Sequence, residues 1–156
     1  MARFRYRMQS ILDLKLKTES QAKAEFGAAQ AQLNEEMARL EELQNRREFY
    51  MSEIVRLQTG RLDVMEIRFN QNAVNNMDAL IEAQKTVIVR AENAVDKARA
   101  KLTAEMQERK MQETLKERAF NEYLAEEKDA EYKESDQRTS FTYGRKTVEN
   151  RRRTNG

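Results

Sequence analysis

The chain offers few of the side chains that usually carry out catalysis. Its 156 residues include no histidine, no cysteine and only four glycines. An imidazole base, a thiolate nucleophile and a glycine-rich phosphate loop are therefore all lacking. The 27 aspartates and glutamates stand beside 29 lysines and arginines, and carboxylates on a charged helix usually form solvated ion pairs. We expect no enzymatic activity, no metal site and no cofactor.

Cationic and aromatic side chains gather instead at the two ends of the chain. The first stretch alternates arginines with large apolar residues and then turns apolar: Arg3, Phe4, Arg5, Tyr6, Arg7, Met8, Ile11. The last stretch closes in three consecutive arginines, Arg151 to Arg153. Such ends could bind nucleic acid, an anionic membrane or an acidic protein surface, or could simply be solvated. For the N-terminal stretch we favour a docking surface.

Two long segments with a coiled-coil repeat must position these ends. In the first, steps of three and four residues land mainly on apolar side chains: Leu12, Lys15, Glu19, Ala22, Phe26, Ala29, Leu33, Glu36, Leu40, Leu43, Arg47, Tyr50, Ile54 and Leu57. In the second they land on Val74, Met77, Ile81, Gln84, Ile88, Ala91, Val95, Ala98 and Leu102. A 3.5-residue repeat of this length predicts two helices that bury one stripe each. Beyond Leu102 we expect the stripe to shift to Met106 and then to thin through Met111 and Leu115.

The break between the segments, Thr59 to Glu66, predicts a tight hairpin. Gly60 is expected to end the first helix in the left-handed conformation, and Asp63 to cap the second. Leu62 and Ile67 have the spacing of a hydrophobic staple.

The predicted fold is all-α, with two long helices that form an antiparallel coiled-coil hairpin. Residues 1–138 make the hairpin, with helix 1 at about 4–58, the turn at 59–63, helix 2 at about 64–138 and an unpaired overhang at about 119–138. Residues 139–156 are expected to be a basic flexible tail. Folding back at the turn sets Phe26 near Val95, Leu33 near Ile88, Leu40 near Ile81, Ile54 near Phe69 and Leu12 near Met111. Both basic ends then come together at the open end of the hairpin.

Three stretches, in order along the chain, resemble the FliJ proteins of the bacterial flagellar type III export apparatus. Residues 4–15 are similar to that family's F-x-F-x-L-x-x-L-L-x-L-K entrance. Residues 57–68 resemble its hairpin crossover, and residues 131–136 resemble its E-x-K-E-x-D close. Where the family usually carries an aromatic pair at the start of helix 2, this chain has Asn70 and Ala73.

The resemblance implies a non-enzymatic protein, similar in fold to the coiled coil of the rotary ATPase gamma subunit. It would act as the central stalk of the FliI export ATPase hexamer, promote assembly of that ring and couple it to the cytoplasmic domain of the export gate FlhA. It would also escort export chaperones. Its expected location is the cytoplasm, peripheral to the inner-membrane export apparatus.

The resemblance also implies two binding surfaces. Docking to the ATPase ring is expected at the open end: Arg3, Phe4, Arg5, Tyr6, Arg7, Met8, Ile11, Phe120, Tyr123 and Leu124. Contact with the export gate is expected nearer the turn: Leu43, Tyr50, Met77, Leu80 and Gln84.

Two other functions remain open. The chain could be the equivalent stalk of a virulence type III secretion injectisome, or a structural homodimeric coiled coil. Nucleic acid is not an expected partner. No apolar run approaches the roughly 20 residues that a transmembrane helix needs.

Overall fold

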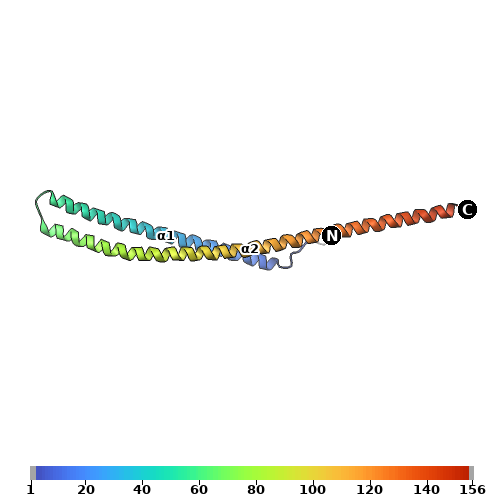
Figure 1. The fold of residues 1–156 in the computed structure, drawn as a ribbon, viewed down its shortest axis with the longest axis horizontal. Helices are drawn as coiled ribbons and strands as arrows, with labels where there is room; N and C mark the ends of the chain where they lie inside the picture. The colour runs from blue at the N-terminus through green and yellow to red at the C-terminus, as the bar shows by residue number, and fades with distance from the viewer. Residues whose placement is uncertain (1–2, 155–156) are drawn as a thin grey trace. The chain divides into compact units, whose positions relative to one another are not determined.

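The computed structural model describes residues 3–154 and shows two long helices. Helix α1 spans Gln9–Gln58 and helix α2 spans Val64–Thr154, and the described residues contain no strand. The helices pack against each other as an all-α helical hairpin (Figure 1), which confirms the predicted fold class. The chain divides into two compact units, one of Leu16–Glu108 and one of Met1–Lys15 with Arg109–Gly156.

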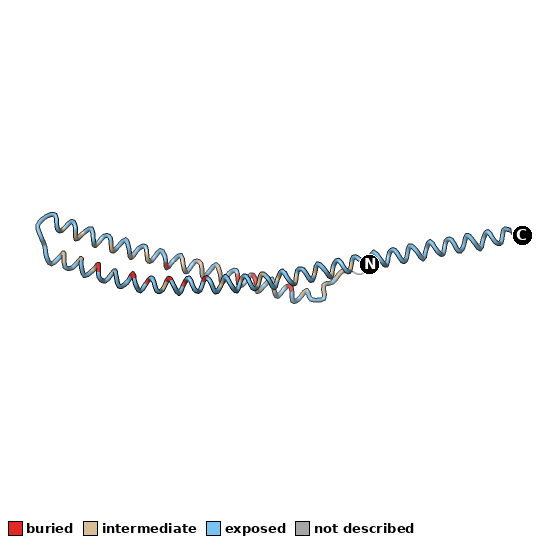
Figure 2. The backbone as a smooth tube through the Cα atoms, viewed as in Figure 1, coloured by how far each residue is buried: buried red, intermediate tan, exposed pale blue. Residues whose placement is uncertain are grey.

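The unit of residues 16–108 buries the two predicted stripes against each other. No predicted stripe position of either helix up to Leu102 is exposed, and the buried ones follow the facing sides of the helices (Figure 2). Its most deeply buried apolar residues are Ala22, Val74, Ile81, Ile88, Ala91 and Val95. Because a two-helix core has one contact layer, many flanking apolar residues stay at its edge, half in water.

Polar contacts between the helices fix the register. The Gln84 amide donates to the backbone oxygen of Glu36 over 2.9 Å and also to its carboxylate. Lys101 reaches Glu25 at 2.9 Å, and the Arg99 guanidinium lies 5.7 Å from the centre of the Phe26 ring. These partners agree with the predicted register, which set Leu33 and Leu40 opposite Ile88 and Ile81.

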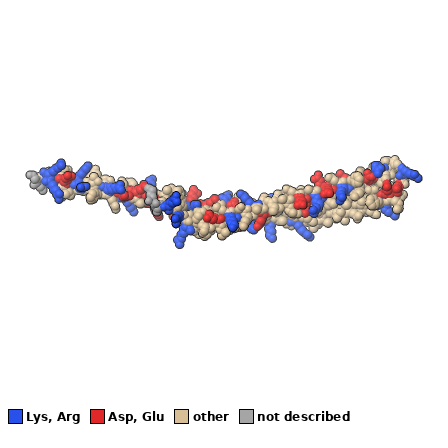
Figure 3. Space-filling view, turned by 180° about the vertical axis from the view of Figure 1, so that it is seen from behind, with Lys and Arg blue, Asp and Glu red and all other residues tan. Residues whose placement is uncertain are grey.

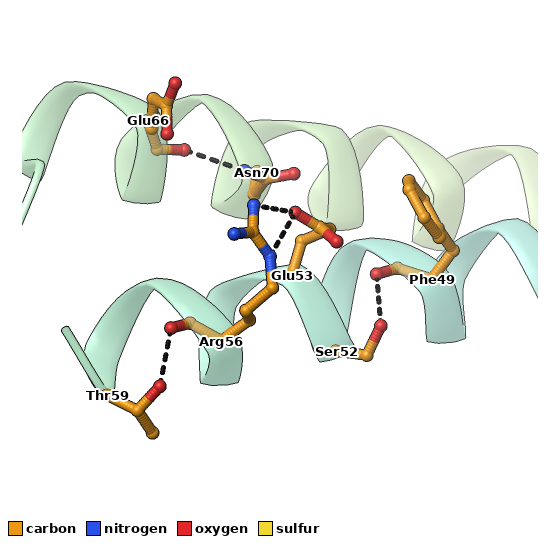
Figure 4. A network of polar contacts seen from close by, with 7 residues as sticks. All are labelled: Phe49, Ser52, Glu53, Arg56, Thr59, Glu66 and Asn70. Atoms are coloured by element: carbon orange, nitrogen blue, oxygen red, sulfur yellow. Dashed lines mark hydrogen bonds and ion pairs between the residues drawn. The ribbon is translucent and has the colours of Figure 1, made fainter.

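The turn is built differently from the prediction at its first half. Asp63 caps α2 as expected, because its carboxylate accepts the backbone N–H groups of Met65 at 3.1 Å and Glu66 at 3.3 Å. Gly60 does not adopt the left-handed conformation. The end of α1 is satisfied by Thr59 instead, whose hydroxyl donates to the Arg56 carbonyl over 2.8 Å (Figure 4). Leu62 is 66% exposed, so it provides little of the expected staple.

The prediction was also largely wrong about which residues continue the stripe beyond Leu102. Met106 is half-buried as expected, but the other covered positions up to residue 116 are polar: Glu105, Arg109, Gln112 and Lys116. Met111, expected to face Leu12, is 63% exposed, and Leu115 is 39% exposed. The helical repeat continues without a shift, and long polar side chains cover the contact with their aliphatic stems.

In the other unit, the N-terminal segment is not helical. Helix α1 begins at Gln9 and not near residue 4, after a turn in which the Met8 carbonyl accepts the backbone N–H groups of Ile11 and Leu12. Ahead of the turn Phe4 and Tyr6 are half-buried while Arg3 and Arg5 are exposed. Outside a helix alternate side chains can face opposite ways, which lets both aromatics be half-buried while the arginines stay in solvent.

Helix α2 continues to Thr154, well past the predicted boundary at 138 and through the segment expected to be a flexible tail. The segment contains no proline, and Gly144 costs a helix only about 1 kcal/mol. Threonine hydroxyls of this stretch donate to carbonyls four residues back, as Thr142 does to Arg138 at 2.8 Å and Thr147 to Tyr143 at 2.9 Å. Every described residue from 128 onwards is exposed. Residues 155 and 156 of the predicted tail lie outside the described part of the chain.

Candidate functional site

The unit that combines the N-terminal residues with the part of α2 from Arg109 onwards is called the N-terminal unit below. Three of its aromatic rings form one cluster, which we call the aromatic cluster: Phe4, Phe120 and Tyr123. The Phe4 ring lies 5.2 Å from the Phe120 ring in an edge-to-face arrangement, and 5.4 Å from the Tyr123 ring. Phe120 and Tyr123 are 6.4 Å apart on consecutive turns of α2. These distances are typical of favourable aromatic pairs. The structure thus brings together three residues that the sequence placed in the ring-docking set from opposite ends of the chain.

The N-terminal segment is also tied to α2 at Gln112. The Tyr6 hydroxyl donates to the side-chain oxygen of Gln112 over 3.1 Å. Leu12, one turn into α1, is only 4% exposed. Two aromatic contacts, one hydrogen bond and a buried leucine therefore hold residues 4–12 in place.

Exposed apolar and cationic side chains lie in the same unit as the aromatic cluster. Arg3, Arg5 and Arg7 project into solvent. Several apolar members of the predicted docking set keep a large exposed fraction: Met8 39%, Ile11 36%, Phe120 42% and Leu124 48%. Partly exposed aromatic rings with arginines beside them are the composition found at the centres of protein interfaces.

The environment of the cluster raises the pKa of the Tyr123 hydroxyl above its usual value near 10. The main cause is partial desolvation of the phenol. A second is the nearby Glu127 carboxylate, whose negative charge disfavours the phenolate.

The tail arginines do not join the cluster, contrary to the prediction that both basic ends meet. Phe4 lies against α2 at residues 120–123, whereas α2 continues beyond them as a helix to Thr154. At about 1.5 Å per residue, Arg151 is roughly 40 Å further along that helix than Tyr123. The N-terminal arginines and the arginines of residues 138–153 are therefore separate features, and the charges of the C-terminal stretch are mixed (Figure 3).

The residues predicted to contact the export gate differ in exposure. Leu80 is 48% exposed, while Leu43, Tyr50 and Met77 are half-buried along the edge of the hairpin. Gln84 is only 6% exposed, and its amide is bonded to Glu36. Its side chain is part of the contact between the helices and does not face a partner.

Sequence reasoning missed two exposed apolar groups. Phe49, 58% exposed, lies 5.7 Å from Tyr50 and lines a shallow groove of about 540 Å³ along α1 with Ala38 and Asn45. Near the turn four apolar residues are more than 60% exposed: Leu62, Val64, Met65 and Phe69. Phe69 was expected to face Ile54 and is instead mostly in solvent. The exposure of both groups could have been predicted from the sequence, because these residues lie outside the 3.5-residue stripe that the hairpin buries.

A polar network stiffens the last turn of α1 beside this patch. The Arg56 guanidinium donates twice to the Glu53 carboxylate, at 2.7 and 3.1 Å (Figure 4). This hydrogen bonding, followed by the charge of the same carboxylate, raises the pKa of Arg56. Arg56 therefore stays charged at the C-terminal end of α1, where a cation is favoured by the helix dipole.

Comparison with known protein families identifies the family of this chain. The model of the flagellar FliJ protein family matches residues 4–147. The chain belongs to the FliJ family. Neither a curated protein nor a solved structure matched it significantly.

Membership of the FliJ family gives the chain a role associated with flagellar type III export. The match begins at Phe4, so it includes the aromatic cluster, both helices of the hairpin and the turn. Within residues 3–154 of this FliJ-family chain, no helix is long and apolar enough to cross a membrane. The same residues contain no group of three or more acidic side chains placed to hold a metal ion.

Proposed function

We propose that this chain is a non-enzymatic stalk and adaptor of the flagellar type III export apparatus. Its N-terminal unit docks into the hexameric ring of the export ATPase FliI and promotes assembly of that ring. The hairpin couples the ring to the cytoplasmic domain of the export gate FlhA, and the chain also escorts export chaperones. It acts in the cytoplasm, at the inner face of the inner membrane.

The observation that supports this proposal most directly is the aromatic cluster in a chain of the FliJ family. Phe4 is held on Phe120 and Tyr123 at 5.2 and 5.4 Å, so the cluster is preorganised before any partner arrives. Preorganised aromatic residues lose little conformational entropy on binding. The adjacent Arg3, Arg5 and Arg7 would direct the cluster to an acidic surface.

For the gate we propose a smaller contact set than the sequence alone predicts. Leu80 provides exposed apolar area on α2, and Met77 flanks it one turn earlier. On α1, Leu43 and Tyr50 provide half-buried area next to the groove that Phe49 lines. Gln84 is left out because its amide is already used by Glu36.

The ring-docking proposal is tested by adding the purified chain to FliI. The ATPase rate and the hexamer fraction should both rise, because a central stalk stabilises the closed ring. Phe4→Ala should weaken the effect about 10-fold or more, the usual cost of an interface anchor.

Phe69→Ala is the matched control for that experiment. It removes the same ring from a 69% exposed site in the other unit, and it should leave the stimulation unchanged. No response of FliI to the unaltered chain would refute the docking proposal, and so would equal effects of the two variants.

The gate contact is tested separately with the cytoplasmic domain of FlhA. Leu80→Asp should reduce its retention on the immobilised chain, because a charge replaces exposed apolar area. Val89→Asp makes the same change at another exposed position of α2, 54% exposed, and should not. Loss of retention with both variants, or with neither, would contradict this surface assignment.

A further inference from the structure

The C-terminal part of α2 carries a second, unused stripe with coiled-coil spacing. Steps of four and three residues from Phe120 define what we call the terminal stripe: Phe120, Leu124, Glu127, Glu131, Glu134, Arg138, Phe141, Arg145, Val148 and Arg152. All of its members are exposed except Glu127, which is half-buried. Phe141 is 72% and Val148 54% exposed, so no segment within residues 3–154 covers the apolar area on this face.

If two copies of the terminal stripe are laid side by side in opposite directions, most of the side chains that face each other are complementary. Two apolar residues begin the stripe and three glutamates follow. The second half alternates arginines with Phe141 and Val148. An antiparallel partner with the same sequence would bring Glu127 and Glu134 opposite arginines and Leu124 opposite an apolar residue. Glu131 would face Phe141, and Phe120 would face Arg152.

We propose that, in chains not docked to the ATPase ring, the terminal stripe pairs with the terminal stripe of a second copy of this chain, as an antiparallel two-helix coiled coil. Phe120 and Leu124 also belong to the predicted ring-docking set, so docking and pairing would exclude each other. The pairing sets Glu127 of each copy opposite Arg145 of the other, and Leu124 opposite Val148. Near the twofold axis Glu134 of one copy faces Arg138 of the other. Within one chain these two side chains already pair at 2.7 Å, so the contact becomes a four-membered charge network. A twofold axis uses every pair twice, which suits a closed dimer.

Neighbouring registers are less favourable. A shift of one heptad in one direction sets Glu131 opposite Glu134, and like charges across a seam repel. A shift in the other direction separates Leu124 from Val148 and leaves no apolar residue of the stripe opposite another. Only the proposed register combines an apolar pair with opposite charges and sets no two glutamates opposite each other.

The face of the stripe carries an open depression at Gly144. It is bordered by Phe141, Arg145, Val148, Glu149 and Arg152. Phe141, Gly144, Arg145 and Val148 have the i, i+3, i+4, i+7 spacing of the residues that surround one inserted side chain in coiled coils. A side chain added at Gly144 would meet open space, so no described part of the chain fills the depression. In the proposed register Glu127 of the second copy enters it and reaches Arg145.

Charge decides between a second copy and an anionic membrane or nucleic acid. The arginines would suit a purely anionic partner, but Glu127, Glu131 and Glu134 lie on the same face and would be repelled by it. A partner that presents both signs in reverse order satisfies most of the stripe.

The proposal is tested by the mass of the intact chain in solution, measured by sedimentation equilibrium over a range of concentrations. The mass should rise from 18.4 kDa towards twice that value, and the dissociation constant should increase with salt. Arg145→Glu should raise the dissociation constant about 10-fold, because each dimer contains the altered pair twice. Adding Glu127→Arg to that variant should restore most of the affinity.

The matched control is Lys146→Glu, which changes the charge equally but projects about 100° round the helix from Arg145. It should leave the dissociation constant unchanged. A chain that stays monomeric at every concentration would overturn the proposal. Equal weakening by the Arg145 and Lys146 variants would also overturn it, as would a paired reversal that fails to restore dimers. Binding of the chain to anionic lipid vesicles, without any dimer in solution, would favour a membrane as the partner and overturn the proposal too.

Discussion

Single polar residues inside the helix contact matter more here than they would in a wide core. Gln84 and Glu36 are 6% exposed each and stand among apolar neighbours. The Glu36 carboxylate accepts from Gln84 and, at 2.9 Å, from Gln32 of its own helix. A buried polar pair of this kind disfavours other alignments of the two helices, because any shift would separate the Gln84 amide from Glu36.

Gln84→Leu should therefore destabilise the hairpin although leucine is more apolar. It leaves the buried Glu36 carboxylate without its donor from α2, at a cost of about 1–3 kcal/mol in the free energy of unfolding. Urea denaturation followed by circular dichroism measures this change. The double variant Glu36→Leu with Gln84→Leu should recover the loss, because both polar groups are removed together. If the double variant were less stable than Gln84→Leu, the pair would not act as described.

Tyr123 should ionise at higher pH in the folded chain than a tyrosine does in the unfolded chain. Desolvation and the Glu127 charge raise its pKa in the folded chain above its value in the unfolded chain, which is near 10. The folded state then binds its proton more tightly, so the contribution of Tyr123 is present below pH 10 and is lost as pH rises through the folded pKa. Ultraviolet titration of the chain against Tyr123→Phe isolates this phenol. A transition at or below the normal value would contradict the packing of the aromatic cluster.

At the scale of elements, the sequence was most informative where apolar residues repeat. The stripe positions from Leu12 to Leu57 and from Val74 to Leu102 could be predicted because a 3.5-residue repeat leaves one face for burial. Most of the stripe beyond Leu102 could not, because Glu105, Arg109 and Lys116 cover the contact with aliphatic stems that a search for apolar residues ignores.

The ends of the helices were harder to predict. Phe4 and Met8 fit the helical repeat and the extended alternation equally well, and only the contact of Phe4 with Phe120 and Tyr123 decides between them. The stretch up to Thr154 resembles a tail in composition, but without proline it contains nothing that stops a helix. Phe4, Phe120 and Tyr123 were all members of the predicted ring-docking set. Their contacts with one another were found only in the structure.

The start of α2 depends on one cap. Asp63→Ala removes the carboxylate that accepts the N–H groups of Met65 and Glu66, and should lower the free energy of unfolding by about 1 kcal/mol. Amide hydrogen exchange should speed up in the first turn of α2. Asp129→Ala removes an exposed carboxylate elsewhere on α2 and should change stability by less than about 0.5 kcal/mol. Equal effects of the two variants would show that the cap contributes nothing specific.

For the molecule as a whole, the two units present different surfaces for different contacts. The unit with the aromatic cluster carries Arg3, Arg5 and Arg7, and in our proposal it enters the ATPase ring. The unit of residues 16–108 carries Leu80, the groove beside Phe49 and the exposed residues near the turn. A protein can couple two partners without chemistry of its own if each partner recognises a different unit.

Photo-crosslinking to the assembled export ATPase tests this division most directly. A photo-reactive phenylalanine replaces either Ile11, 36% exposed in the unit of the aromatic cluster, or Met65, 80% exposed near the turn. We predict that the Ile11 probe forms an adduct with FliI and the Met65 probe does not. An adduct from Met65 with none from Ile11 would contradict the proposed polarity of docking.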